Sequence, residues 1–398
     1  MSQAQLGAVA ERAGEDAAAR QLSGPDAAPT RRPVVRVLQV VLSLHPGGTE
    51  RLVVELARRL AGRATTMVCC LDEAGTWGEE LATSGVPVVA LGRRPGFRPR
   101  LGLRIAAAAA AHRADVIHCH HYSPFVYACV SRLAYGGARL LFTEHGRLAD
   151  APPSPRRRAA NALLARLPDR VFTVSEDLRR HLVSEGFAPG QVTVVHNGID
   201  VPPLPPPHAR AEARAALGFP ADALVLMTVA RLDPVKDLGS LLASGSMLSE
   251  HYPGVRLAIV GDGPERPALE ADAARRGLGE PERFTGHRED VRALLAAADI
   301  YVNSSTFEGV SLTILEAMAA ALPVVATQVG GTPEVVTAEA GVLVRPRDPV
   351  ALAAALTRLA RDEQARLALG RGGRRRVEER FTLDRMVQTY FDVYRELR

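Results

Sequence analysis

The sequence predicts an α/β protein with two doubly wound, Rossmann-like domains. Short apolar segments typical of buried parallel strands alternate with helical segments, which is the pattern of a sheet covered on both faces. The alternation stops at the proline-rich stretch P-P-L-P-P-P and then restarts. With 398 residues and 47% hydrophobic side chains, the chain can build two cores.

The first domain is expected to cover residues 33–201. Its first strand, 34–42, leads into a tight loop at 45–49 and a helix at 50–61. Further strands are expected at 65–70, 86–90, 116–119, 139–142, 171–174 and 192–195, with helices at 77–83, 100–112, 124–135, 156–167 and 176–184. Residues 1–32 lack a clear apolar stripe and are expected to form a mobile tail.

A linker is expected at 202–209 and a second domain at 210–381, because prolines exclude a helix interior or a central strand. Strands are expected at 224–229, 255–260, 300–302 and 323–326, and helices at 238–249, 264–274, 291–297, 312–321, 350–361 and 363–371. The last segment, 382–398, carries an apolar helical stripe that must be buried.

The stretch N-S-S-T-F-E-G-V-S-L-T-I-L-E-A-M, residues 303–318, is the most informative one. It predicts a strand end, a loop in which Gly309 permits a tight turn, and a helix capped by Ser311. Such a turn presents backbone N–H groups to an anion. Glu308 and Glu316 bracket the turn, and they are either ordinary surface charges or parts of one pocket. Because apolar residues surround Glu316, a lone carboxylate there would be costly.

Two cations follow the first strand of the second domain. Arg231 and Lys236 flank its first loop, and Lys236 is the single lysine beside 48 arginines. A compact ammonium is therefore expected to be required there, because a guanidinium is planar and bulkier. The next strand ends in G-D-G-P-E, where Gly263 either lets a nucleotide approach or only completes a turn. Arg266 replaces the third glycine of the dinucleotide fingerprint, which disfavours a dehydrogenase.

The first domain offers glycines and histidines at its strand ends. Gly47 and Gly48 follow the first strand and either approach a ligand or form a turn. His118 and His120 end another strand, and His145 follows a third. A zinc site is conceivable, but no paired metal-ligand spacing supports it. Hydrogen bonding in the core or in a cleft is the preferred expectation.

Charge and cysteine usage restrict partners and location. Residues 34–200 contain 21 arginines and 14 acidic residues, so the first half is the basic one. The arginines cluster at 93–104 and 156–158, which is either a solvated surface or a face for an anionic membrane or a phosphate-bearing acceptor. The four cysteines lack C-x-x-C spacing, which favours reduced thiols and a cytoplasmic protein. No segment is long enough and apolar enough to predict a membrane span.

The motifs, taken together, resemble those of retaining glycosyltransferases of family 4, which have the GT-B fold. They are G-G-T-E at 47–50, D-V-I-H-C-H at 115–120, T-E-H-G at 143–146, V-S-E at 174–176, N-G-I-D at 197–200, A-R-L-x3-K at 230–236, G-D-G-P-E at 261–265 and E-x7-E at 308–316. Singly most are weak, but their order and spacing are specific. The resemblance covers nearly everything from Val34 onward.

The resemblance implies transfer of a hexose-type sugar from a nucleotide diphosphate sugar, of UDP or GDP type, to an acceptor hydroxyl. Arg231 and Lys236 would hold the diphosphate, Glu316 the ribose, and Glu308 the sugar. The donor-binding set implied is Gly48, Arg231, Lys236, Gly263, Glu308, Gly309, Val310, Ser311 and Glu316, and the acceptor side Gly47, His118, His120, His145 and Asn197. His118, Glu308, Arg231 and Lys236 would be catalytic. The C-terminal helix would return to the first domain.

No cofactor and no metal are expected, because two cations and a helix N-terminus can balance the diphosphate. Expected partners are the donor, a glycan or lipid-linked acceptor in surface polysaccharide or glycolipid assembly, and peripherally the inner face of an anionic membrane; nucleic acid is not expected. A GT-B sugar-nucleotide epimerase and a non-catalytic sugar-nucleotide-binding protein remain alternatives.

Overall fold

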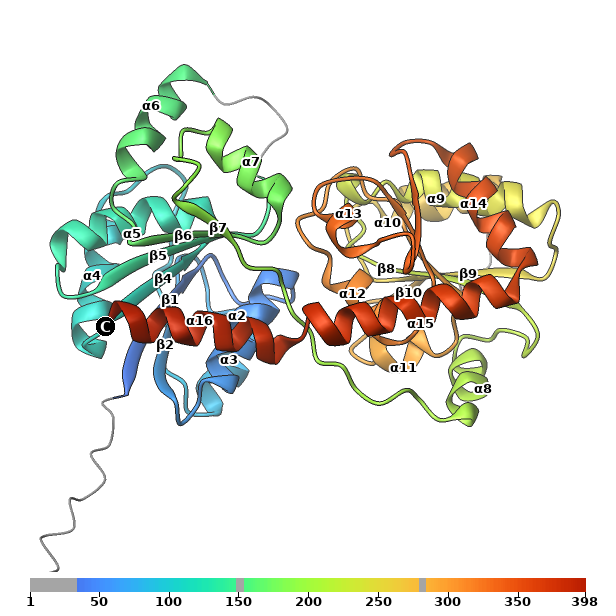
Figure 1. The fold of residues 1–398 in the computed structure, drawn as a ribbon, viewed down its shortest axis with the longest axis horizontal. Coiled ribbons are helices and arrows are strands. Elements are labelled where there is room, and N and C mark those ends of the chain that lie inside the picture. Colours follow the sequence, from blue (N-terminus) through green and yellow to red (C-terminus); the bar gives the residue numbers. More distant parts are fainter. Residues whose placement is uncertain (1–33, 148–153, 279–283) are drawn as a thin grey trace, which may run out of the picture. The chain divides into compact units, whose positions relative to one another are not determined.

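The computed structural model describes residues 34–147, 154–278 and 284–398. The tail expected at 1–32 lies outside the described residues. The remainder contains two sheets, and each is built from consecutive strands (Figure 1). Two parallel α/β sheets confirm the predicted fold class.

The first sheet has the strand order β3-β2-β1-β4-β5-β6-β7, and its neighbours pair in parallel. Its strands are β1 Val35–Val41, β2 Ala64–Cys70, β3 Val88–Ala90, β4 Val116–His120, β5 Arg139–Glu144, β6 Arg170–Thr173 and β7 Val192–Val194. Its helices are α2 Gly48–Arg59, α3 Thr76–Thr83, α4 Arg100–His112, α5 Tyr122–Ala134, α6 Pro155–Leu164 and α7 Glu176–Ser184. The order reverses beside β1, so the loops after β1 and β4 flank the point where ligands bind in such sheets.

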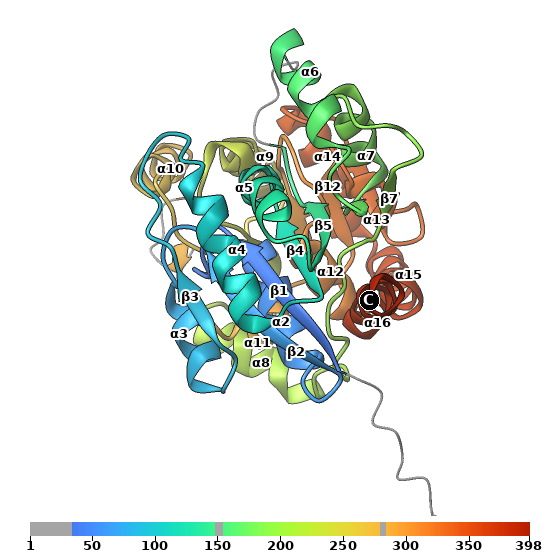
Figure 2. The same cartoon turned by 90° about the vertical axis from the view of Figure 1, so that its left-hand side faces the viewer.

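Alternating side chains of β1 bury both faces of this sheet. Val37 packs with Leu52 and Leu56 of α2, whereas Leu38 packs with the cluster that contains residues of α4 and α5. Figure 2 shows α4 and α5 side by side on the same side of the sheet. Burial on both faces explains why the strands have near-continuous apolar sequences.

The second sheet has the strand order β10-β9-β8-β11-β12-β13 and is also parallel. Its strands are β8 Leu224–Val229, β9 Val255–Val260, β10 Phe284–Gly286, β11 Ile300–Asn303, β12 Val324–Thr327 and β13 Gly341–Val344. Its helices are α8 Pro207–Ala216, α9 Leu238–Ser249, α10 Arg266–Arg275, α11 Val291–Leu295, α12 Leu312–Ala319, α13 Thr332–Val335, α14 Pro349–Arg361 and α15 Glu363–Arg380, with a 3-10 turn at Pro234–Lys236. The order reverses between β8 and β11, which places the loops after these two strands together.

Three local expectations differ from the structure. Helix α8 begins at Pro207, inside the range expected as linker, because proline fits the first turn of a helix. Helix α15 continues to Arg380, well past the expected end, although it contains Gly370, Gly372 and Gly373. A Cβ at Gly370 or Gly372 would lie about 2 Å from the backbone oxygens of Ala321 or Glu339. The glycines therefore allow close packing, which outweighs their low helix propensity. Strands β10 and β13 were not expected.

The C-terminal helix α16, Leu383–Leu397, packs on the first sheet, as the resemblance implied (Figure 1). Tyr390 and Tyr394 are buried in one cluster with Val37 and Phe172. A bridge between Ile199 and Thr382 fixes the point at which the chain crosses back. The predicted apolar stripe is thus buried against the domain at the other end of the sequence.

Candidate active site

The stretch after β11 forms the predicted strand, loop and helix. Ser311 caps α12 by accepting a hydrogen bond from the Ile314 N–H at 3.4 Å. Among the described residues, no acceptor binds the backbone N–H groups of Gly309, Val310 or Ser311. These groups therefore lie free at the positive end of an eight-residue helix.

Glu308 and Lys236 form a direct ion pair. The Lys236 Nζ donates to Glu308 Oε1 at 2.7 Å, and the same oxygen accepts bonds from Ser305 Oγ at 2.6 Å and Asn303 Nδ2 at 3.1 Å. Burial favours the neutral acid, but the Lys236 charge and these hydrogen bonds outweigh it and lower the pKa of Glu308. Glu308 is therefore held as a carboxylate. The loop after β8 brings the two side chains into direct contact.

Arg231 lies outside this cluster. Its side chain is 72% exposed and pairs with Asp233 at 3.0 Å. Its expected role in holding a diphosphate stays a prediction. Gly263 packs against the same loop, since a Cβ there would come within 2.8 Å of the Leu232 backbone. This close approach explains why a glycine is needed at this position, whether or not a nucleotide binds there.

Glu316 is bound by an arginine from the first domain. Arg51 Nη1 donates to Glu316 Oε1 at 2.5 Å, and Glu316 is almost fully buried. The sequence analysis did not single out Arg51, although it directly follows the G-G-T-E motif in the first turn of α2. Gly48 lies in the same turn, and a Cβ there would meet only Leu312 of α12, at 3.8 Å. The structure thus brings together the G-G-T-E motif of the first domain and the E-x7-E motif of the second, which were both expected to contribute to donor binding.

His118 lies in the core of the first domain. It is fully buried, its Nδ1 lies 2.6 Å from Tyr394 Oη, and its Nε2 lies 2.8 Å from Thr143 Oγ1. Both ring nitrogens therefore have protein partners. The resemblance implied a catalytic and acceptor-side role for His118, which this buried position does not support, because alternation on β4 directs the ring beneath α16.

His120 continues the same buried network. Its Nε2 lies 2.8 Å from Gln39 Oε1, its Nδ1 lies 3.0 Å from His145 Nε2, and Gln39 Nε2 donates to Tyr394 Oη at 3.2 Å. Burial is the main cause that lowers the pKa of His120 and of His145, so both rings are neutral. These contacts link β1, β4 and β5 to α16, which is the core hydrogen bonding that the sequence analysis preferred. No metal-binding group of three His, Cys, Asp or Glu side chains occurs within 34–147, 154–278 and 284–398.

His121 is the histidine that leaves the sheet. It has a left-handed backbone, with φ of 71°, directly after β4. Its Nδ1 lies 2.9 Å from Glu144 Oε1 and its Nε2 lies 3.0 Å from Thr49 Oγ1. Burial disfavours the charged ring, but Glu144 and Glu50 outweigh it and raise the pKa of His121. The only sequence signal for His121 was its position directly after D-V-I-H-C-H.

Further contacts join the loops at the carboxyl ends of the first sheet to the loop before α12 in the second domain. Asn197 Nδ2 donates to the Val310 carbonyl at 3.0 Å, which orients the loop before α12. A Cβ on Gly309 would lie 2.3 Å from the His145 carbonyl oxygen. Glycine is therefore required here for close backbone approach. Asn197 and His145 thus contact the loop that carries Glu308.

This arrangement defines a class of protein. Two parallel α/β sheets meet at their carboxyl ends, where free amides, a lysine and two buried carboxylates lie together. Such a combination is typical of a GT-B glycosyltransferase, because a diphosphate needs donors and cations while sugar hydroxyls need carboxylates.

The comparisons with known proteins give the family. Residues 46–202 match the family model described as Glycosyltransferase Family 4, and residues 223–362 match Glycosyl transferases group 1. The D-inositol 3-phosphate glycosyltransferase of Saccharomonospora viridis is 33% identical over 304 aligned residues, and the match covers 71% of this chain and 70% of the relative. The glycogen synthase of Mycobacterium tuberculosis is 29% identical over 309 residues, 74% of this chain and 72% of that one. The chain belongs to glycosyltransferase family 4.

A comparison with solved structures bears on the fold. The structure of Anabaena Alr3699/HepE in complex with UDP matches with a TM-score of 0.81 and 24% identity, covering 91% of this chain and 100% of that one. The protein is a glycosyltransferase with the GT-B fold.

Proposed function

We propose that this enzyme transfers a hexose-type sugar from a UDP- or GDP-sugar to a hydroxyl of a glycan or lipid-linked acceptor, with retention of anomeric configuration. The observation that carries the proposal is the Lys236–Glu308 pair beside the free amides of residues 309–311. The resemblance of the motifs to retaining enzymes of family 4 supplies the stereochemistry. Assembly of a surface polysaccharide or glycolipid is the proposed setting.

The charges suit departure of a nucleoside diphosphate. When the bond between the sugar C1 and the phosphate oxygen breaks, negative charge grows on the diphosphate and positive charge on the sugar ring. Lys236 and the amides at the α12 N-terminus stabilise the first, and the Glu308 carboxylate stabilises the second. Glu308 accepts hydrogen bonds from sugar hydroxyls and positions the ring, because its depressed pKa keeps it from donating a proton.

Glu316 is proposed to bind the ribose hydroxyls of the donor. Its carboxylate accepts a hydrogen bond from Arg51 in the structure. A ribose must therefore share Glu316 with this arginine or displace it. In either case Arg51 lies at the donor site, where its guanidinium adds a positive charge from the first domain.

The acceptor is proposed to lie on the side of the first domain, near the loops after β1 and β4. The relative from Saccharomonospora viridis is named for an inositol phosphate, which shows that the family includes enzymes for phosphorylated polyols. No helix among the described residues is long and apolar enough to cross a membrane. Any contact with a lipid-linked acceptor is therefore proposed to be peripheral.

Ligand-dependent melting tests the donor class. Melting temperatures are measured with UDP-, GDP- and ADP-sugars and with the free nucleotides, and a rise with UDP- or GDP-sugars is expected. Nuclear magnetic resonance of the product then gives the anomeric configuration. Conversion of the donor sugar without an acceptor would instead support the epimerase, and binding without turnover across an acceptor panel would support a non-catalytic protein.

A further inference from the structure

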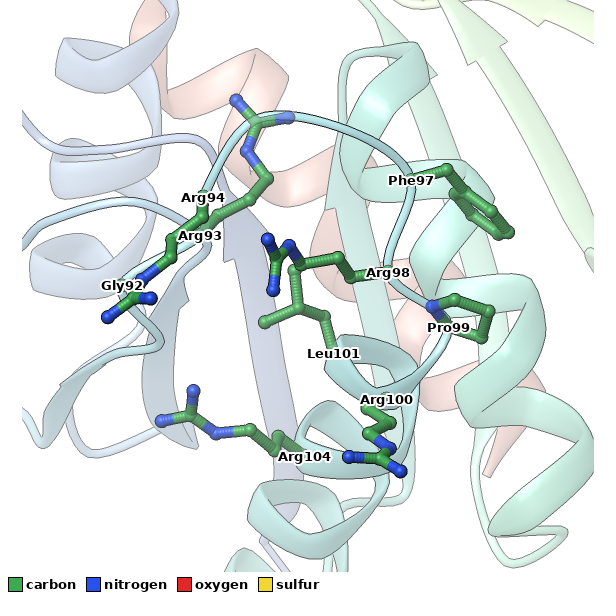
Figure 3. Close-up of a pocket in the computed structure, with 9 residues that line it drawn as sticks. All are labelled: Gly92, Arg93, Arg94, Phe97, Arg98, Pro99, Arg100, Leu101 and Arg104. Carbon is green, nitrogen blue, oxygen red and sulfur yellow. The ribbon is translucent and has the colours of Figure 1, made fainter.

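The loop between β3 and α4 forms a pocket lined by arginines that the proposed reaction has not used. Its volume is about 430 Å³, and its lining residues are Gly92, Arg93, Arg94, Phe97, Arg98, Pro99, Arg100, Leu101 and Arg104. In Figure 3 the loop arches over the pocket, the Arg98 side chain points into its middle and the Phe97 ring points away.

The positive charge of this pocket is only partly neutralised. Arg93 donates to both carboxylate oxygens of Asp72, at 2.7 and 3.0 Å, and Arg104 donates to the Leu91 carbonyl. Arg94, Arg98 and Arg100 are exposed, and their side chains have no hydrogen-bond or ion-pair partner among the described residues. Three guanidinium groups therefore remain available for a ligand.

The surroundings add to this positive potential. Residues 92–114 contain six arginines and no aspartate or glutamate. Helix α4 begins at Arg100 with no acidic residue in its first turn and no side-chain cap. Because a helix N-terminus favours negative charge, arginines at this end repel both the dipole and one another. A bound oxyanion relieves both repulsions.

The loop is held in place before any ligand binds. The Gly92 and Arg93 N–H groups donate to carbonyls at the end of β2, from Asp72 and Leu71. The Arg98 N–H donates to Tyr127 Oη at 3.3 Å, and the Phe97 ring stacks on the Tyr127 ring at 5.4 Å. An anchored loop lowers the entropy cost of binding.

The pocket lies at the same sheet edge as the donor-side loop of the first domain. It follows β3, which is two strands from β1, so a spacing of about 10 Å separates the two strand ends. The loop after β2 connects them, because the Leu44 N–H donates to the Ala74 carbonyl at 3.1 Å. The pocket and the loop after β1 therefore share the carboxyl edge of the first sheet.

We propose that this pocket binds a phosphate group carried by the acceptor. The inference rests on the proposed function, since it places the acceptor at the carboxyl edge of the first sheet. Guanidinium groups bind phosphate through paired, charge-assisted hydrogen bonds. The phosphate is either that of a soluble phosphorylated polyol or that of a lipid headgroup, and the two sources share this chemistry.

The test compares the triple variant Arg94→Gln/Arg98→Gln/Arg100→Gln with the wild-type enzyme. Calorimetric titrations use inorganic phosphate, D-inositol 3-phosphate and free inositol, each with excess UDP present so that the donor site is filled. The triple variant is expected to bind the two phosphates at least about tenfold more weakly. Free inositol should bind to the wild type far more weakly than D-inositol 3-phosphate does. Its affinity should be the same for the wild type and the triple variant.

A matched control removes the same charge from the second domain. The variant Arg358→Gln/Arg371→Gln/Arg375→Gln changes three exposed arginines whose side chains have no hydrogen-bond or ion-pair partner among the described residues. It should bind phosphate as the wild type does. The proposal would be overturned if the triple variant of the pocket bound phosphate as tightly as the wild type. It would also be overturned if the pocket variant and the control variant lost the same amount of phosphate affinity.

A vesicle experiment separates the two sources of phosphate. Flotation uses phosphatidylcholine vesicles with and without phosphatidylinositol. Loss of D-inositol 3-phosphate binding in the pocket variant supports a soluble acceptor, and loss confined to phosphatidylinositol vesicles supports a lipid headgroup. Titration of UDP alone tests the donor site separately, so failure of the donor proposal and failure of the phosphate pocket give different results.

Discussion

Replacing Lys236 with alanine tests the central electrostatic argument. The substitution removes the ammonium that lies 2.7 Å from Glu308 and beside the free amides of the α12 N-terminus. Loss of one charge-stabilising group costs about 2–4 kcal/mol of transition-state stabilisation. At 1.36 kcal/mol per factor of ten, kcat/KM should fall by about 30- to 900-fold.

The same substitution also affects the fold, so its two effects must be separated. Removing one partner of a buried pair costs about 3–5 kcal/mol, but Lys236 is 22% exposed and Glu308 keeps Ser305 and Asn303, so the cost here should be smaller. Because Lys236 lowers the pKa of Glu308, this pair stabilises the fold above the unfolded pKa and loses that effect as pH falls through the folded pKa. Thermal melts across that acid range should show less pH dependence in the variant.

The assay measures initial rates of nucleoside diphosphate release with saturating acceptor. Arg358→Gln provides a control, because Arg358 is an exposed cation of α14 with no side-chain partner among the described residues. Near-normal turnover of a folded Lys236→Ala enzyme would refute placement of the diphosphate at this lysine. Lys236→Arg should remain impaired, and full activity would refute the argument from the solitary lysine.

Four further outcomes are expected. Gly48→Ala should fold normally, because its Cβ meets only Leu312 at 3.8 Å, yet bind nucleoside diphosphate about ten- to a hundredfold more weakly in calorimetry; unchanged affinity would place the phosphate elsewhere. Tyr394→Phe should lower the unfolding free energy in urea by about 1–3 kcal/mol, because His118 Nδ1 and Gln39 Nε2 lose their partner; an unchanged value would contradict the network. Burial, with a smaller effect of the neighbouring His145, lowers the pKa of His118 to about 3. Between about pH 6.5 and pH 3 only the unfolded chain therefore binds this proton, and stability should fall by about 1.4 kcal/mol per pH unit. Melts of His118→Gln should show a shallower slope, and an identical slope would exclude this histidine as the cause. Turnover should persist in EDTA, and complete loss with rescue by Mn²⁺ would refute the metal-independent proposal.

The local sequence determined most of the fold. Apolar strands that alternate with amphipathic helices specify a parallel sheet, because a strand buried on both faces needs helices on each side. Helices α4, α7 and α9 have the predicted bounds. The Ser311 cap was also predictable, because a cap depends on residues a few positions apart. The sequence analysis placed the start of α8 in the linker and ended α15 too early. Proline, which breaks helix interiors, fits the first turn of α8, and the glycines of α15 allow close packing.

Only the tertiary structure decided which side chains meet. Lys236 and Glu308 are 72 positions apart, and Arg51 and Glu316 are 265 apart, so no local pattern could pair them. Burial of His118 likewise depends on α16, which returns from the far end of the chain. The sequence alone determined the fold class and the family motifs, because hydrophobic periodicity and turn chemistry act over short spans. Ion pairing and burial depend on the packing of distant segments, which only the folded chain specifies.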